Sequence, residues 1–186
     1  MLRLDQPDAS FTIICVVVDS GYEGPQSRLN NLSEFCSLAD IPTYAINSAQ
    51  DVDAVFPQLF SPGFRIIALS QRLFRQPMLD LGVVAKGDGV THHSTGEDLT
   101  VVSFNFSLPQ AHQLTLTAGE RGLSCDLIAY SHAMPRDWSL VLQSALKTNK
   151  VVILDDSRSL NRSSDRLRLA LYENVPGVKI IAQQKQ

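Results

Sequence analysis

The order of predicted strands and helices constrains the fold of this chain more than any other feature. Short apolar runs rich in β-branched residues alternate with stretches of helical spacing, which is typical of a parallel sheet covered by helices. The run TIICVVV at 12–18 is apolar throughout, as expected for a strand buried on both faces. The predicted strands are 12–18, 43–46, 64–69, 99–106, 125–130, 150–156 and 178–181, and the predicted helices are 28–39, 50–60, 109–120, one from about 137, and 160–173.

Two of the predicted helices have clear start signals. Ser48 and Asp51 stand three residues apart before the 50–60 helix, which is the spacing of a capping box. Asp137 is a natural N-cap for the helix that follows it. The apolar residues of that helix recur at helical spacing and predict one buried stripe, made of Trp138, Val141, Leu142, Ala145 and Leu146.

Residues 75–98 interrupt the alternation, because they mix proline, glycine, serine, threonine and charged residues. We therefore expect an α/β unit at 1–75, a linker or surface strap at 76–96, and a second α/β unit at 97–186. The fold class is α/β, with two three-layer units whose sheets are mostly parallel. The first unit has only three predicted strands, fewer than the typical five or six, so we expect it to be truncated and therefore to associate with a partner.

Composition excludes several classes of partner. The chain has 186 residues, a net charge of −3 and a pI near 5.7. This charge lacks the basic excess that is typical of proteins that bind nucleic acid or anionic membranes. No apolar run approaches the roughly 18 residues that span a bilayer, and the N-terminus is too polar for a secretory signal. The three cysteines have no metal-binding spacing. We expect a cytoplasmic protein with no nucleic-acid or membrane partner.

Two polar motifs in the 76–96 segment invite a metal reading. Gly-Asp-Gly around Asp88 resembles a thiamine-diphosphate metal motif, but that motif has an asparagine about thirty residues later, where this chain has TLTA at 115–118. A Gly-Asp-Gly turn is the better interpretation. His92 and His93 are adjacent, so in an extended segment they point to opposite sides and do not share one ion. We expect them in a solvated loop.

Polar residues also follow two predicted strands, at the edge where open α/β sheets bind ligands. Ser131 and His132 follow strand 125–130, but the orienting carboxylate and the GxSxG elbow of a serine hydrolase are missing. His132 is then a cleft or interface histidine, or a surface one. Asp155 and Asp156 close strand 150–156, either as capping acids for the 160–173 helix or as site residues.

From Leu81 to Asp155 the chain resembles the end of the beta subunit of thiamine-dependent 2-oxo-acid dehydrogenases, within the transketolase-like superfamily. The resemblance rests on GEDLT opening a strand, on MPRDW with Pro135 and Asp137 before a helix, and on ALKTNKVVILDD, where Asn149 replaces the usual glycine. The first half, with GYEGPQSRLNNLSEF, IPTYAINSAQDVDAVF and FRIIALSQRLF, is similar to the closing portion of the family's pyrimidine-binding domain. The resemblance implies a transketolase C-terminal-like domain at 97–186.

The departures from the family pattern bear on catalysis. The turn GYEGPQSRLN normally reads Gly-Pro-x-His, with a histidine that reaches the active site, whereas here Gln26 is followed by Ser27 and Arg28. The glutamate that activates the cofactor and the diphosphate-binding domain have no counterpart in this sequence. We expect no catalytic, cofactor or metal ligands in the isolated chain. Residues of a cleft or interface are predicted to be Gln26, Ser27, Arg28, His132, Asp137 and Asp155.

The resemblance leaves two functional classes open. In the first, the chain is a subunit or fragment of a thiamine-dependent enzyme and contributes the subunit interface and part of the active-site wall. The partner of the chain is then a second copy, a diphosphate-binding subunit, or both. Thiamine diphosphate and magnesium bind only when the diphosphate-binding subunit is present. In the second, the chain is a non-catalytic paralogue that serves assembly. The family's C-terminal domain helps to form subunit interfaces, which suits either class.

Overall fold

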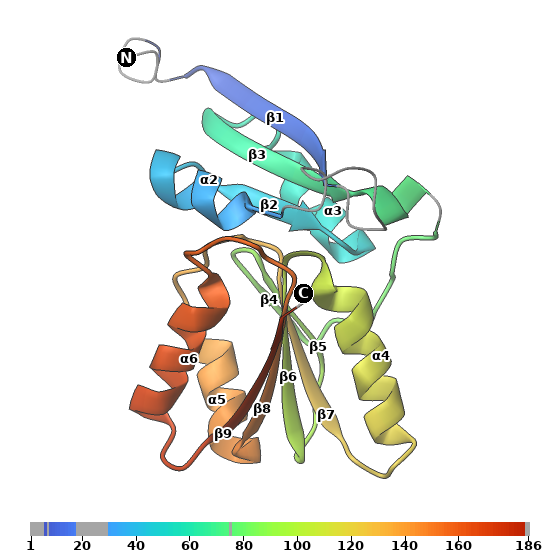
Figure 1. Ribbon diagram of the computed structural model, residues 1–186. Coiled ribbons are helices and arrows are strands. Elements are labelled where there is room, and N and C mark those ends of the chain that lie inside the picture. Colours follow the sequence, from blue (N-terminus) through green and yellow to red (C-terminus); the bar gives the residue numbers. More distant parts are fainter. Residues whose placement is uncertain (1–5, 7, 18–29, 75, 185–186) are drawn as a thin grey trace.

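The computed structural model describes residues 6, 8–17, 30–74 and 76–184. Two sheets lie one above the other, and helices cover both faces of each (Figure 1). The α/β class with mostly parallel strands is confirmed.

The smaller sheet has three parallel strands in the order β1-β3-β2. Its elements are β1 (Ser10–Val17), α2 (Leu32–Ala39), β2 (Thr43–Ile46), α3 (Ala49–Val55), β3 (Gly63–Ser70) and the short 3₁₀ turns Phe56–Gln58 and Gln71–Phe74. Helix α2 packs on Ala45 and Ala68, whereas α3 packs on the alternate residues Ile46 and Ile67, so the helices cover opposite faces.

The predicted capping box at the start of α3 is confirmed. The Ser48 hydroxyl accepts a hydrogen bond from the Asp51 backbone N–H at 3.2 Å. In return, the Asp51 carboxylate accepts from the backbone N–H of Ser48 at 3.0 Å and of Asn47 at 2.9 Å. Three backbone N–H groups at the start of the helix are thereby satisfied.

The larger sheet has six strands in the order β4-β5-β7-β6-β8-β9. Its elements are β4 (Ala85–Gly87), β5 (Val90–Ser94), β6 (Leu99–Phe104), the 3₁₀ turn Asn105–Ser107, α4 (Leu108–Gly119), β7 (Cys125–Tyr130), α5 (Ser139–Thr148), β8 (Lys150–Asp155), α6 (Ser163–Asn174) and β9 (Lys179–Gln184). Helix α4 lies on one face, and α5 and α6 lie on the other (Figure 1).

The segment 76–96, expected to be a linker, contains two strands of this sheet. β4 and β5 form an antiparallel hairpin, and β5 pairs antiparallel with β7. The expected Gly-Asp-Gly turn is confirmed, because Asp88 and Gly89 connect the two strands and Gly89 has φ of 64°. The strand Val90–Ser94 is polar and short, so it has little of the apolar pattern that identified the other strands.

The helix expected from about residue 137 begins at Ser139, with Trp138 as its N-cap residue. Asp137 is one position too early to be the cap, but its carboxylate accepts from the backbone N–H of Ser139 at 2.9 Å and from the Ser139 hydroxyl at 3.0 Å. The predicted stripe holds for Val141 and Ala145, which are fully buried, but Leu146 is 60% exposed.

The two sheets meet where the outer edge of β2 contacts the segment after β7. The backbone N–H of Ala45 donates to Ser131 O at 2.7 Å, and the N–H of Ala133 donates to Thr43 O at 2.8 Å. Tyr44 and His132 form an isolated antiparallel bridge between these bonds. The backbone of residues 131–133 therefore supplies hydrogen-bond partners for the N–H of Ala45 and the carbonyl oxygen of Thr43 on the outer edge of β2.

No helix within the described ranges has the length and apolar character needed to cross a bilayer.

Candidate functional site

The carboxyl ends of β6, β7 and β8 face the smaller unit, which places the polar residues after these strands in the seam between the units (Figure 1). Asn105 follows β6, His132 comes shortly after β7, and Asp155 ends β8. This edge of an open α/β sheet is where such folds bind ligands. The seam is therefore the candidate functional site.

His132 is held by the β4–β5 hairpin. The carbonyl oxygen of Gly89 accepts from the backbone N–H groups of Ser131 at 2.9 Å and His132 at 3.2 Å. A Cβ at position 89 would collide with the Cβ of His132, so only glycine allows this approach. The turn of the hairpin consequently fixes the backbone of His132 and brings Asp88 to the same place.

The imidazole of His132 is a neutral hydrogen-bond donor. Burial lowers the pKa of His132, although Asp88 acts in the opposite direction. Its Nδ1 accepts from the Met134 N–H at 3.1 Å, which leaves the proton of the neutral ring on Nε2. The ring packs edge-on against Tyr44, with centroids 5.0 Å apart.

A cavity of about 570 Å³ opens beside this histidine. It includes the predicted site residues His132 and Asp137, together with Asp88, Arg136 and Arg166. Cys36 also lines the cavity, but burial raises its pKa, so it is a thiol and not a reactive thiolate. Among the described lining residues, no nucleophile is hydrogen-bonded to a general base.

Asp155 lies elsewhere in the seam, away from the 570 Å³ cavity. Its Oδ1 accepts from the Asn105 side-chain amide at 3.2 Å and from the Ser157 N–H at 2.9 Å. Asp156 Oδ1 accepts from the Phe106 N–H at 3.0 Å. The reading of these acids as helix caps is wrong, because α6 begins only at Ser163.

The two histidines of β5 point to opposite sides, as predicted, but the expected solvated loop is wrong. His93 is buried and hydrogen-bonds through Nδ1 to Gly82 O at 2.9 Å. His92 bonds through Nε2 to the carboxylate of Asp126 on β7. Both are strand residues because β5 pairs with β7. No cluster of three or more His, Cys, Asp or Glu suited to a metal occurs in the described ranges.

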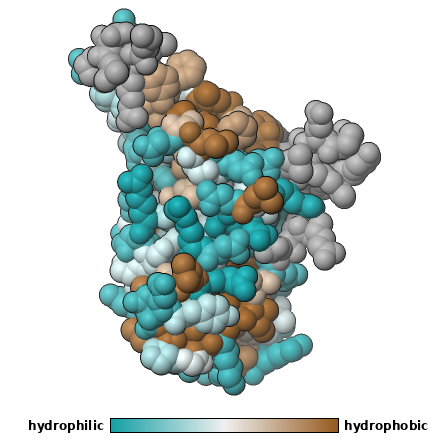
Figure 2. All heavy atoms as spheres, turned by 60° about the vertical axis from the view of Figure 1, so that its left-hand side comes forward, coloured by the Kyte–Doolittle hydropathy of each residue, from teal (hydrophilic) through white to brown (hydrophobic). Residues whose placement is uncertain are grey.

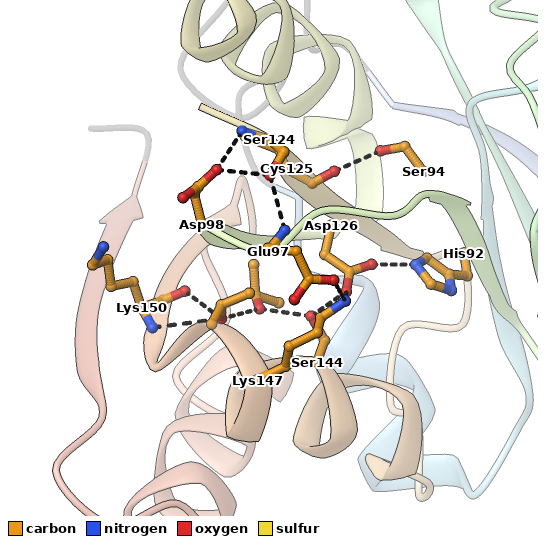
Figure 3. Close-up of polar contacts among 12 residues, drawn as sticks. His92, Ser94, Glu97, Asp98, Ser124, Cys125, Asp126, Ser144, Lys147 and Lys150 are labelled. Atoms are coloured by element: carbon orange, nitrogen blue, oxygen red, sulfur yellow. Dashed lines mark hydrogen bonds and ion pairs between the residues drawn. The ribbon is translucent and has the colours of Figure 1, made fainter. Parts of the chain in front are cut away.

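Sequence reasoning missed the buried Asp126, the centre of a polar network (Figure 3). Its Oδ2 accepts from the Ser144 hydroxyl at 2.7 Å and lies 3.1 Å from Lys147 Nζ. The bond to Asp126 raises the pKa of Lys147. Asp126 accepts from His92, Ser144 and Lys147 at once and lines neither cavity, which indicates a structural role. An acid within the apolar run CDLIAY was the available signal.

The remaining predicted residues have separate outcomes. Gln26, Ser27 and Arg28 lie outside the described residues. Asp137 lines the 570 Å³ cavity, and its carboxylate accepts from the Ser139 backbone N–H. The structure thus brings His132 and Asp137 to one cavity and places Asp155 at another.

Comparison with known proteins places the fold among transketolases. No protein-family model matches the chain. A split-gene transketolase, described as an inactive beta4 tetramer, is similar with a TM-score of 0.72 and 15% identity, over 96% of this chain and 58% of that one. A transketolase from Campylobacter jejuni is similar with a TM-score of 0.61 and 16% identity, and the match covers 94% of this chain and 27% of that one. A mutant transketolase from Pichia stipitis is similar with a TM-score of 0.57 and 13% identity, and the match covers 89% of this chain and 28% of that one.

These identities establish the fold and no more. The chain spans about three fifths of the split-gene protein and about a quarter of the two longer transketolases. The expected transketolase-like architecture is confirmed over nearly the whole chain, and the described residues have a transketolase-like α/β fold.

Proposed function

We propose that this chain is a component of a thiamine-dependent enzyme of the transketolase or 2-oxo-acid dehydrogenase type, and that it works only within an assembly. The transketolase-like fold supports the enzyme class. The main observation that supports assembly is the open edge of β1.

β1 is an eight-residue strand that pairs with β3 alone among the described strands. Apolar side chains on both of its faces are exposed: Phe11 by 54%, Ile13 by 44%, Ile14 by 57% and Val16 by 49%. Figure 2 shows apolar surface gathered at this end of the molecule. Long apolar edge strands associate with other chains unless they are covered.

The geometry of β1 indicates what covers it. Ile14 and Val16 stand beside Ile67 and Leu69 on the face that α3 covers, whereas Phe11 and Ile13 stand beside Phe64 and Ile66 on the other. A partner that buries both faces must add a strand beside β1 and a layer above and below it. We assign this role to a diphosphate-binding subunit that supplies the cofactor site, or to a second copy of the chain.

A non-catalytic assembly module is the second candidate. Two observations favour it: the turn that normally has a histidine reads Gln26-Ser27-Arg28, and the described lining of the large cavity has no nucleophile with a base. In both candidates the isolated chain does not bind thiamine diphosphate.

The assembly is tested by sedimentation velocity at micromolar concentration. We expect the wild-type chain to associate and Ile14→Lys to shift it toward monomer, since a charge on an edge strand opposes pairing. Leu169→Lys is the matched control, because Leu169 is 61% exposed on α6, away from β1. A monomeric wild type, or equal loss of association in both variants, would contradict the proposal.

The enzyme class is tested by calorimetry with thiamine diphosphate and magnesium. The isolated chain should give no binding heat, and heat should appear after a diphosphate-binding subunit is added. Association without cofactor binding in the mixture would favour the assembly module. Micromolar binding by the isolated chain would overturn both candidates.

A further inference from the structure

Two buried oxygen atoms in the seam have no hydrogen-bond partner: Oδ1 of Asn105 and Oδ2 of Asp155. Both residues are 3% exposed. Asp155 ends β8 and Asn105 directly follows the adjacent parallel strand β6, whose last residue, Phe104, pairs with Asp155. A buried acceptor without a donor is costly, and most have a partner in folded proteins.

The orientation of the Asn105 amide is fixed by its bond to Asp155. Its Nδ2 donates to Asp155 Oδ1 at 3.2 Å, so reversing the amide would set two oxygens against each other. The backbone of Asn105 has φ of 52° and its carbonyl oxygen accepts from the Asn47 side-chain amide. The two free oxygens therefore belong to side chains that are already joined by a hydrogen bond, and with Asp155 ionised both can only accept.

The charge of Asp155 is also unbalanced. Its Oδ1 has two neutral donors, from Asn105 and Ser157, and it makes no ion pair with a basic side chain in the described ranges. Arg72 reaches this edge of the sheet, but its Nη2 donates to the carbonyl oxygen of Phe106 at 2.7 Å. Burying a carboxylate without a compensating charge is strongly unfavourable. An occupant with positive charge would satisfy both oxygens and the charge.

We propose that Asn105 and Asp155 bind a hard metal cation. Carboxylate and amide oxygens are the ligands that such cations prefer. A cavity of about 250 Å³ adjoins Asp155, and Asp156 supplies a further carboxylate in its lining. The charge of Asp155 alone balances K⁺ or Na⁺, whereas Mg²⁺ or Ca²⁺ also needs Asp156. The site does not depend on the proposed function.

The test is thermal unfolding of chelator-treated protein in KCl, NaCl, MgCl₂ or CaCl₂, each against choline chloride at equal ionic strength. At least one metal salt should raise Tm, by roughly 5–10 °C at about 100 times its dissociation constant. Equilibrium dialysis with elemental analysis should then find one equivalent of that cation per chain. No rise above choline chloride, or no bound metal, would overturn the proposal.

Variants separate the site from general salt effects. Asp155→Asn keeps the shape and removes the charge, so it should abolish the rise in Tm. Asn105→Gly keeps the left-handed backbone and removes the amide oxygen, so it should weaken the rise. Asp53→Asn is the control, because Asp53 is an exposed carboxylate on α3 and should respond like the wild type. A full response in Asp155→Asn would refute the assignment.

Discussion

Replacing Asp126 by alanine should lower the free energy of unfolding of the larger unit far more than a surface substitution does. Asp126 is 2% exposed and joins three elements, because it contacts His92 on β5 and both Ser144 and Lys147 on α5 (Figure 3). Alanine leaves these three donors without their acceptor. Removing one member of a buried charged network typically costs about 3–5 kcal/mol of unfolding free energy.

The individual contacts lead to a similar figure. His92 is 13% exposed, so its charge-assisted bond contributes about 1.5–3 kcal/mol. The Ser144 hydroxyl also contacts Thr100 at 2.7 Å and loses only one of its bonds, about 1 kcal/mol. Lys147 is 35% exposed and can turn to solvent, so its ion pair contributes less than about 1 kcal/mol.

Urea unfolding followed by Trp138 fluorescence measures this loss. Trp138 is the only tryptophan and packs against Phe104 and Tyr130 in the larger unit, so it reports that unit. Asp165→Asn, which removes a partly exposed surface carboxylate from α6, should change the free energy of unfolding by less than about 1 kcal/mol. A loss below about 1 kcal/mol for Asp126→Ala would show that the network contributes little and would refute the reasoning.

Three further outcomes are expected. Burial lowers the pKa of both His93 and His132, so the unfolded chain binds more protons and stability should fall as pH drops below about 6.5. The midpoints of urea unfolding at pH 7.5 and 5.5 measure this loss. His93→Gln should reduce the difference between the two midpoints. Gly89→Ala should lower Tm, because position 89 has positive φ and its Cβ would meet His132. Ser48→Ala should cost about 1 kcal/mol in urea unfolding through loss of the capping box, and an unchanged midpoint would contradict that.

Much of the fold follows from local signals in the sequence. The strands at 43–46 and 125–130 were predicted with their observed bounds, because each is an apolar run limited by polar residues. The β4–β5 hairpin was missed because β5 is stabilised by pairing with β7 and not by its own composition. Asp88-Gly89 between two extended segments was the local signal for that hairpin.

The candidate site was less predictable, because its parts come from distant segments. His132 and Asp155 were singled out correctly as residues at strand ends, yet nothing local shows that they lie at different cavities. Asn105 was not singled out at all. Its importance arises from the neighbouring strand β8, which brings Asp155 to it.

The seam explains why β1, and not β2, is the open edge of the smaller sheet among the described strands. β2 would be as exposed as β1 if the segment after β7 did not hydrogen-bond to it through Thr43 and Ala45. Because that segment is itself fixed by Gly89, the larger unit satisfies the β2 side of the smaller sheet, whereas β1 has no strand on its outer side among the described residues. We therefore expect the partner that we propose to add a strand beside β1, and substitutions on β2 to affect folding of the chain and not its association.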